Sequence, residues 1–293
     1  MILPLRPRRS VLFMPGANVR ALAKARTLEA DGLILDLEDA VAPDMKELAR
    51  QQVVAAIRQG GYGPRELVVR INALASRWGG ADVAAVAGCG ADAILAPKIE
   101  SAADVLALIA ALDEAGAPAG IPVWAMVETP RAFLRLDAIA SAHSRLAVLV
   151  VGTADLVKDL HARHSKERVE TATARSLVVL AARAYGLGAL DGVHLDLEDD
   201  AGLALACAQG RDMGFDGKTL IHPKQIETAN AAFSPSSQEI REASEIVAAW
   251  RGAQAAGQGV VVVNGRLVEQ LHVEEAERLL AIAETIARKA VPA

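Results

Sequence analysis

Acidic residues follow two apolar segments near the middle of this chain, at the points where those segments end. Glu128 directly follows Val123–Val127, and Asp155 comes shortly after Leu146–Val151. If these segments are neighbouring strands of one parallel sheet, both carboxylates lie at the same edge, where they repel each other unless a proton or a cation lies between them. Two protein oxygens suit Mg2+, with Mn2+ as a substitute. Salt bridges to residues of neighbouring strands are the alternative.

Arg70 lies near the end of an earlier apolar segment. Its planar, permanently charged guanidinium suits a substrate carboxylate or a developing enolate oxygen. The alternative is that Arg70 only neutralises Asp36 or Glu38, and both roles are compatible because a guanidinium has five donors. Asp36 and Glu38 are also the first candidates for a base in this region. His222 follows the last apolar segment, where a lone histidine is expected to be structural.

A basic, turn-rich stretch lies near the amino terminus. Phe13, Arg20 and Lys24 fall within or shortly after the first apolar segment. Such a cluster could hold the phosphates of a nucleotide-like group. A solvated helix face is the alternative.

Eight short apolar segments, separated by helical patterns, must position these side chains. Such a series of β/α units predicts an α/β protein with a closed (β/α)8 TIM barrel, in which the polar strand ends converge. The alternative is a doubly wound open sheet, but no G-x-G-x-x-G motif follows the first strand. The expected strands are Ser10–Met14, Leu33–Asp36, Leu67–Ile71, Ala93–Ala96, Val123–Val127, Leu146–Val151, Gly192–Leu195 and Lys218–Ile221.

The composition narrows the class of protein further. Hydrophobic residues make up 52% of the chain and aromatic residues only 3%, so the core must consist of alanine, valine, leucine and isoleucine. The formal net charge of −5 provides no overall basic field, and we do not expect nucleic acid as a partner. No apolar run is long enough for a signal peptide or a membrane span. We therefore expect a cytoplasmic protein without a membrane partner.

The pattern changes after about Phe233. A helix ending near Gln254, a strand and hairpin turn around Asn264-Gly265, and a final helix from Val273 to Lys289 are expected there. Residues 1–233 should therefore form the catalytic barrel, and residues 234–293 a small hairpin-and-helix extension. Because such an extension buries little apolar surface, we expect it to serve as a lid or in oligomerisation.

The chain resembles the citrate lyase β-subunit and malyl-CoA lyase group of the HpcH/HpaI aldolase superfamily. The resemblance rests on motifs that occur in one order along nearly the whole chain. They are RSVLFMPG (9–16), LILDLEDAVAP (33–43), VVRIN (68–72), APKIES (96–101), VETPRA (127–132), VGTADL (151–156), GFDGKTLIHPKQIE (214–227) and AFSPS (232–236).

The resemblance implies a Mg2+ ion held by Glu128 and Asp155, with Arg70 at the substrate. It also implies that Asp36 and Glu38 complete the site. Relatives commonly have an acidic residue directly before the second metal ligand, where this chain has alanine, but the aligned ligand itself is present.

Coenzyme A is expected, by the same resemblance, to lie over the first strand and helix near Phe13, Arg20 and Lys24. A tail residue of a neighbouring subunit transfers a proton in some relatives. Here Glu269 stands where those relatives have aspartate, and its longer side chain puts the carboxylate in a different place. A homo-oligomer, a trimer or a hexamer, is the implied assembly.

The implied activity is that of a carbon–carbon lyase. It would cleave or form a 2-hydroxy-acid-type acyl-CoA such as malyl-CoA or citramalyl-CoA, with acetyl-CoA and a 2-oxo acid as the other partners. Hydrolysis of a malyl-CoA-type thioester and the citryl-thioester lyase reaction of a citrate lyase β subunit are alternatives that keep the same site. An alternative of another class is a catalytically silent barrel that serves as a subunit or binding module.

Overall fold

The computed structural model describes residues 6–255 and 257–290 of the chain. The described residues form two compact units. One contains Arg8–Phe233, and the other contains the chain from Ser234 onward.

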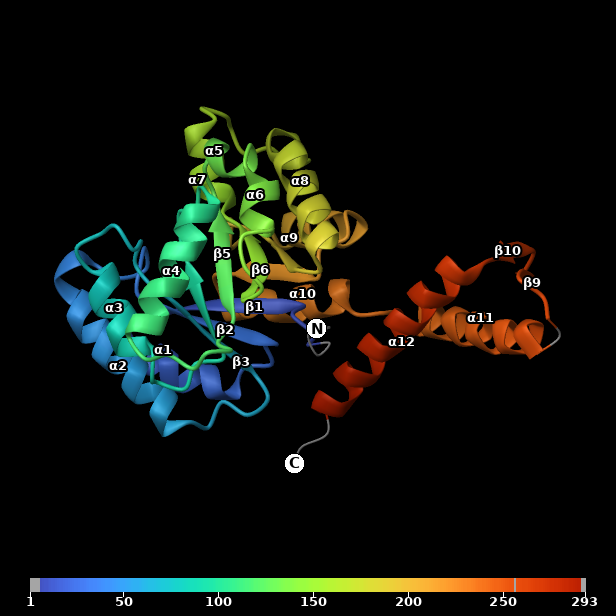
Figure 1. Ribbon diagram of the computed structural model, residues 1–293, viewed down its shortest axis with the longest axis horizontal. Coiled ribbons are helices and arrows are strands. Elements are labelled where there is room, and N and C mark those ends of the chain that lie inside the picture. Colours follow the sequence, from blue (N-terminus) through green and yellow to red (C-terminus); the bar gives the residue numbers. More distant parts are fainter. Residues whose placement is uncertain (1–5, 256, 291–293) are drawn as a thin grey trace. The chain divides into compact units, whose positions relative to one another are not determined.

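The first unit is a closed barrel of eight parallel strands (Figure 1). Each strand pairs with the next along the chain, and the last pairs with the first. The predicted (β/α)8 barrel is therefore confirmed, and the open sheet is excluded because an open sheet leaves two edges unpaired. The strands are β1 (Ser10–Pro15), β2 (Gly32–Asp36), β3 (Glu66–Arg70), β4 (Ala93–Ala96), β5 (Val123–Val127), β6 (Leu146–Val151), β7 (Gly188–Asp191) and β8 (Gly217–Leu220).

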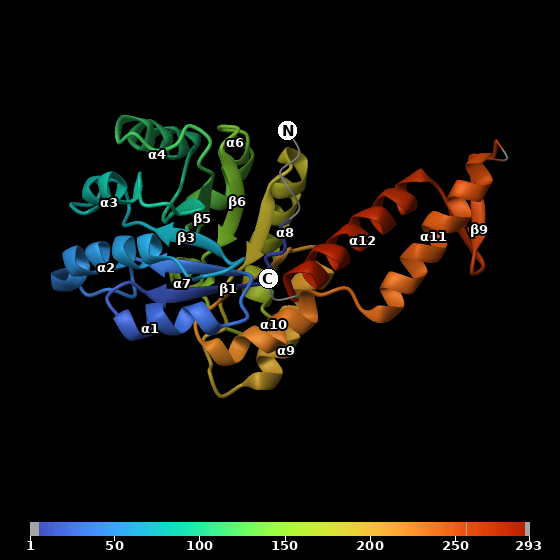
Figure 2. The same cartoon turned by 90° about the horizontal axis from the view of Figure 1, so that it is seen from below.

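Helices surround the strands on the outside, as Figure 2 shows from a second direction. The α-helices of this unit are α1 (Val19–Lys24), α2 (Lys46–Gln59), α3 (Gly79–Val86), α4 (Ala102–Glu114), α5 (Pro130–Phe133), α6 (Leu136–Ala140), α7 (Thr153–Asp159), α8 (Val169–Tyr185), α9 (Asp200–Asp212) and α10 (Ile226–Phe233). Three 3-10 helices join them: η1 (Ala25–Thr27), η2 (Pro43–Met45) and η3 (Pro223–Gln225).

Two apolar layers hold the barrel together, because side chains alternate between the two faces of a strand. One layer fills the barrel interior and includes Val11, Ile34, Val68, Trp124 and Val148. The other layer lies between strands and helices, and it contains the alternate strand residues together with one face of each long helix. Every residue of β2 to β6 is buried, as expected for a parallel sheet covered on both faces.

The same alternation selects the side chains at the carboxyl-terminal ends of the strands, which we call the strand-end mouth. In β1, Phe13 lies two residues after Val11 and on the same interior face. Asp36 likewise lies two residues after Ile34 in β2, and Arg70 two residues after Val68 in β3. On β5 and β6 the next interior positions after the strands are Glu128 and Gly152. The positions of Phe13, Asp36, Arg70 and Glu128 at the mouth thus follow from strand register.

The prediction of the seventh strand is wrong. Strand β7 covers Gly188–Asp191 instead of Gly192–Leu195. The small residues of β7 give a weak apolar signal, and at Gly188 a small residue fits the packing because a Cβ there would come within 3.2 Å of Val148. The acidic end of β7 is Asp191, which is fully buried.

Asp191 belongs to a structural ion-pair cluster between the barrel and its helices. Its carboxylate accepts hydrogen bonds from Lys218 at 3.0 Å and from Arg168 at 2.7 Å. Burial alone would raise the pKa of Asp191, but the two cations lower it to about 2. The cluster joins β7, β8 and the start of α8 on the outer side of the barrel.

The second unit consists of two long helices and a hairpin. Helix α11 (Ser237–Ala255) packs against α12 (Gln270–Ala290), and strands β9 (Val261–Val263) and β10 (Arg266–Val268) form the antiparallel hairpin. Its turn is Asn264-Gly265, where both residues have the positive φ that a tight hairpin turn requires. The final helix starts three residues earlier than predicted. The small core of this unit contains Ala243, Val247, Trp250, Val268, Val273 and Ala276.

No helix among the described residues is long and apolar enough to cross a membrane. Both cysteines, Cys89 and Cys207, are buried and unpaired by a disulfide, and burial raises the pKa of each thiol. They serve as packing residues.

Candidate active site

The strand-end mouth is organised by an ion pair between two neighbouring strands. The register places Asp36 of β2 directly beside Arg70 of β3. Arg70 donates from Nε to Oδ1 of Asp36 at 2.7 Å and from Nη2 to Oδ2 at 2.5 Å. Asp36 is fully buried and Arg70 is 7% exposed, so this bidentate pair is protected from solvent and from screening by salt.

Asp36 has no acceptor position left for a substrate. Besides the two bonds from Arg70, its Oδ1 accepts the backbone N–H of Glu38 at 2.9 Å and its Oδ2 accepts that of Ala40 at 3.1 Å. A carboxylate offers about four acceptor positions, and all four are occupied. Asp36 therefore orients Arg70 and the loop after β2, and it is a poor candidate for the base.

Glu38 differs from Asp36 because one of its oxygens has no hydrogen bond. Oε1 accepts a bond from Nζ of Lys98 at 2.9 Å. Oε2 lies 3.1 Å from Nη1 of Arg70, an ion pair without the angles of a hydrogen bond, and it is buried. Burial raises the pKa of Glu38, although Arg70 and Lys98 lower it. Of the two acidic residues after β2, Glu38 is thus the one that could accept a proton.

Arg70 performs the neutralising role that the sequence allowed, and its Nη1 makes no hydrogen bond to a carboxylate but donates to Sδ of Met126 at 3.8 Å, a weak acceptor. Its guanidinium lies over the ring of Phe13 at 4.6 Å, a distance typical of a cation–π contact. Burial lowers the pKa of Arg70, but Asp36 and Glu38 raise it by more. The group is therefore always charged, and Nη1 is the nitrogen that Asp36 does not occupy.

Glu128 lies at the end of β5 in a nearly closed environment. It is 2% exposed, and Oε1 accepts the backbone N–H of Lys98 at 2.7 Å. Burial, together with the nearby carboxylates of Glu38 and Asp155, raises the pKa of Glu128 to about 8, although the hydrogen bond from Lys98 opposes this shift. The predicted pair Glu128 and Asp155 is thus close enough for one charge to affect the other.

The pair has no salt bridge. Within the described part of the chain, neither Glu128 nor Asp155 has a lysine, arginine or histidine nitrogen within ion-pair distance. Two carboxylates without a cation fit a hard divalent ion such as Mg2+, which accepts few protein oxygens and keeps its other positions for water or substrate. No group of three or more His, Cys, Asp or Glu side chains among residues 6–255 and 257–290 offers a fuller metal site.

Gly152 makes the position of Glu128 possible. Because Val127 of β5 pairs with Val151 of β6, the next residues on the two strands also lie side by side. A Cβ at Gly152 would lie 2.4 Å from Cβ of Glu128 and 2.6 Å from its Oε2. Gly152 was not identified as a site residue from the sequence, although it belongs to the VGTADL motif.

Two lysines at the mouth were also missed. Lys98 contacts both Glu38 and Glu128, as described above. Lys46, at the start of α2, is buried and donates to the carbonyl oxygens of Leu37 and Glu38 at 2.9 and 2.7 Å, and to Asn72 at 2.7 Å. Lys46 therefore fixes the loop that carries Glu38. Its position in the chain gave no signal, because the bonds join residues far apart in sequence.

The residues expected to contact coenzyme A do not form one cluster. Phe13 faces the barrel interior and packs on Arg70, whereas Arg20 and Lys24 are exposed on α1, one helical turn apart. Glu269 is exposed in the second unit, between β10 and α12, where its backbone N–H donates to His272. His222 accepts the backbone N–H of Lys224 and begins η3, which is a structural role.

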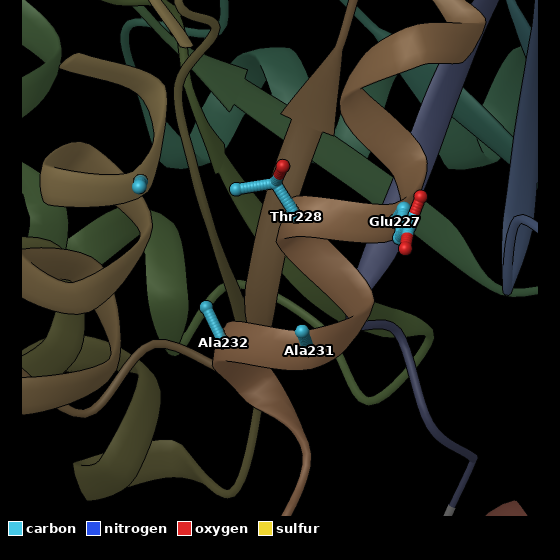
Figure 3. Close-up of a pocket in the computed structure, with 5 residues that line it drawn as sticks. Glu227, Thr228, Ala231 and Ala232 are labelled. Carbon is cyan, nitrogen blue, oxygen red and sulfur yellow. The ribbon is translucent and has the colours of Figure 1, made fainter. Parts of the chain in front are cut away.

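A groove elsewhere on the barrel unit contains none of the predicted site residues. It is lined by Ala204 of α9 and by residues of α10, which Figure 3 shows as sticks: Glu227, Thr228, Ala231 and Ala232. These are small or singly charged side chains on a helix surface. We therefore place the candidate active site at the strand-end mouth.

Comparison with known proteins agrees with the fold and the motifs. The chain is 49% identical to the (3S)-malyl-CoA thioesterase of Cereibacter sphaeroides (strain KD131), over 96% of each protein. It is 37% identical to the citrate lyase subunit beta of Escherichia coli (strain K12), over 95% of this chain and 94% of that protein.

A solved structure of protein CitE from Mycobacterium tuberculosis, in complex with magnesium, acetoacetate and coenzyme A, is also similar. It matches with a TM-score of 0.76 and 33% identity, over 96% of this chain and 100% of CitE. Residues 9–223 match the HpcH/HpaI aldolase/citrate lyase family, as the motifs predict. The chain therefore belongs to the HpcH/HpaI aldolase/citrate lyase family of enzymes.

Proposed function

We propose that this chain is a Mg2+-dependent enzyme that cleaves a malyl-CoA-type thioester between carbon atoms, giving acetyl-CoA and a 2-oxo acid. The observation that carries this proposal is the pair Glu128 and Asp155, two carboxylates without a salt bridge at the strand-end mouth, where Glu128 is close to Glu38, the ion-pair partner of the buried Arg70. The complex of CitE with magnesium, acetoacetate and coenzyme A supports the metal and the coenzyme. Citramalyl-CoA is a second substrate of the same type.

Glu128 and Asp155 would hold the metal through carboxylate oxygens, for which Mn2+ is a substitute for Mg2+. Bound Mg2+ would supply a Lewis acid to the carboxylate and the adjacent oxygen of the substrate. Glu128 must be ionised for this role, and its burial makes the ionised form costly unless a cation is close.

Arg70 would stabilise the charge that develops on the thioester oxygen when the carbon–carbon bond breaks. Its Nη1 is the donor left free by Asp36, and Asp36 together with Phe13 holds the guanidinium in one orientation. Donors fixed before the reaction stabilise a transition-state charge without reorganisation. Asp36 thus acts as a positioning residue in this proposal.

Glu38 would be the base. Its free Oε2 would take the proton of the 2-hydroxyl group, the carbon–oxygen double bond of the oxo acid would form, and the electrons of the broken carbon–carbon bond would pass to the thioester enolate. Proton return to the enolate carbon then gives acetyl-CoA. Glu269 of a second subunit is our candidate for this return, and Arg20 and Lys24 are our candidates for the coenzyme A phosphates.

Hydrolysis of the same thioester is the second candidate reaction. It is favoured by the 49% identity to a (3S)-malyl-CoA thioesterase, which exceeds the 37% identity to a citrate lyase β subunit. In hydrolysis a water molecule attacks the thioester carbon, and negative charge develops on the same oxygen. Arg70 would therefore serve both reactions.

The products separate the two reactions. The protein is incubated with malyl-CoA and Mg2+, and the products are separated by chromatography. Acetyl-CoA with glyoxylate indicates the lyase, and free coenzyme A with malate indicates hydrolysis. Methylmalyl-, citramalyl- and 3-hydroxy-3-methylglutaryl-CoA extend the panel. A protein that binds no Mg2+ and converts none of these thioesters would be a silent barrel, contrary to our proposal.

A further inference from the structure

Lys98 has a backbone conformation that a lysine rarely adopts. Its φ is 54°, in the left-handed region, directly after β4 and Pro97. An L residue with a Cβ is strained there, whereas glycine is not. Such strain at a non-glycine residue points to a requirement at that position that the turn alone does not explain.

The strained backbone and the side chain of Lys98 contact two different carboxylates of the mouth. The backbone N–H donates to Oε1 of Glu128 at 2.7 Å, and Nζ donates to Oε1 of Glu38 at 2.9 Å. Glycine could provide the first contact without strain, but only a long cationic side chain provides the second. The second contact therefore accounts for a lysine at this position.

The contact with Lys98 also determines whether the other carboxylate oxygen of Glu38, Oε2, can bond to Arg70. Arg70 lies 3.1 Å from Oε2 of Glu38 but forms no hydrogen bond with it. Without Lys98, the carboxylate of Glu38 would be free to rotate and bond to Nη1 of Arg70. That change would occupy both the proposed base and the arginine nitrogen that forms no hydrogen bond with a carboxylate in the present structure.

We propose that Lys98 is a positioning residue that holds Glu38 away from a full hydrogen bond with Arg70 and at a fixed separation from Glu128. This inference rests on the proposed roles of Glu38 and Arg70. Half of the Lys98 side chain is exposed, so its ion pair contributes little to the stability of the fold. Its effect should therefore appear in turnover and in the position of Glu38.

Three substitutions separate the parts of this role. Lys98→Met keeps the length and the strained backbone but removes the charge, Lys98→Gly also removes the strain, and Lys98→Arg restores a cation. We expect kcat to fall about tenfold to a hundredfold in Lys98→Met and Lys98→Gly, with KM changed less than kcat. Lys98→Arg should recover a large part of the loss. His161→Gly is the matched control, because His161 has the same φ of 54° and lies outside the site.

Metal binding provides a readout that does not depend on activity. Titration with Mg2+ by calorimetry should give similar affinities for the wild-type protein and Lys98→Gly, because glycine keeps the N–H that bonds to Glu128. A wild-type kcat in Lys98→Met would overturn the inference, and so would a Lys98→Arg protein no more active than Lys98→Met.

A crystal structure of Lys98→Met separates failure of this inference from failure of the proposed function. Glu38 should turn onto Arg70, whatever the substrate of the enzyme is. If Glu38 keeps its wild-type position in that structure, Lys98 does not position it and the inference is wrong. If Glu38 moves but no thioester is cleaved by the wild-type protein, the proposed function is wrong and the positioning role remains.

Discussion

Arg70 shows how one side chain can stabilise the fold and remain available for chemistry. Two of its nitrogens bind Asp36, and Nη1 lies 3.1 Å from Glu38 without a hydrogen bond to it and donates only weakly to Sδ of Met126. A lysine at this position could not fill the two bonds to Asp36 and also direct a third donor to the substrate.

Arg70→Lys should therefore reduce kcat/KM by about a hundredfold or more, the loss typical for a donor to a transition-state oxyanion. The measurement is steady-state kinetics with malyl-CoA at saturating Mg2+. Thermal unfolding of the same variant serves as the control for folding. If Arg70→Lys turns over as the wild type does, Arg70 is only the partner of Asp36.

Because the pKa of Glu128 is raised, we expect the stability of the metal-free folded protein to fall as the pH rises. Its pKa is raised to about 8 by burial and by Glu38 and Asp155, so the metal-free folded state keeps a proton that the unfolded state releases above about pH 4.5. The folded state therefore loses stability as pH rises from 4.5 toward 8, and the loss levels off above that.

The measurement is urea unfolding of the metal-free protein between pH 5 and pH 9, compared with Glu128→Gln. The difference between the two proteins should change along this range and become constant above about pH 8. Addition of Mg2+ at high pH should restore stability to the wild type only. A difference that does not change with pH would mean that Glu128 titrates as an ordinary exposed glutamate.

Residue types and strand ends predicted that Glu128, Asp155, Arg70 and Glu38 lie at one end of the barrel, and the structure has Glu128 near Asp155 and Glu38, and Glu38 in an ion pair with Arg70. The sequence could not show that Asp36 is saturated with hydrogen bonds, because two of its four donors come from a different strand and two from the loop that follows. Lys98 was assigned no specific role for a similar reason. Its φ and its two contacts depend on the closed barrel, not on the local pattern.

Strands β5 and β6 position the proposed metal ligands through their register. The pairing of Val127 with Val151 brings Gly152 against Glu128. A side chain at Gly152 must therefore displace the carboxylate, although φ at this residue is −92° and suits any amino acid.

Gly152→Ala should weaken Mg2+ binding by about tenfold to a hundredfold, the range for changes that disturb the support of a metal ligand. Isothermal calorimetry measures the affinity. Gly80→Ala is the matched control, because a Cβ there meets nothing within 4 Å, and it should bind Mg2+ normally. Normal binding by Gly152→Ala would separate Glu128 from the metal site.

Eight apolar segments in alternation with helices were enough to predict the barrel, since no other common fold arranges that many parallel strands in sequential order. The seventh strand was misplaced by four residues because Gly188 and Ala189 give little apolar signal. A Cβ at Gly188 would pack tightly against Val148 of β6 and against Arg8, contacts that the sequence does not show.

The small core of the second unit is relevant to how subunits of this protein assemble. With Ala243, Val247, Trp250 and a few further residues as its core, it buries little apolar surface, as a hairpin and two helices must. We predict that it covers the strand-end mouth of a neighbouring subunit and brings Glu269 to the reacting carbon, as part of the proposed homo-oligomer.

Glu269→Gln should then be nearly inactive while it binds Mg2+ as the wild type does. Mixing it with Arg70→Lys under conditions that allow subunits to exchange should restore part of the activity, because some mixed sites combine an intact barrel with an intact tail. A strictly monomeric protein in analytical ultracentrifugation, or a fully active Glu269→Gln, would leave Glu38 as the only proton-transferring group proposed.

The central claim is that Glu128 and Asp155 hold a divalent metal on which cleavage of a malyl-CoA-type thioester depends. The most direct measurement follows malyl-CoA consumption by the fully chelated protein before and after Mg2+ is added, with Glu128→Gln and Asp155→Asn in parallel. We predict no consumption without metal, recovery with Mg2+ or Mn2+ in the wild type, and little recovery in either variant despite normal folding. Full activity in the chelated wild-type protein would contradict the account.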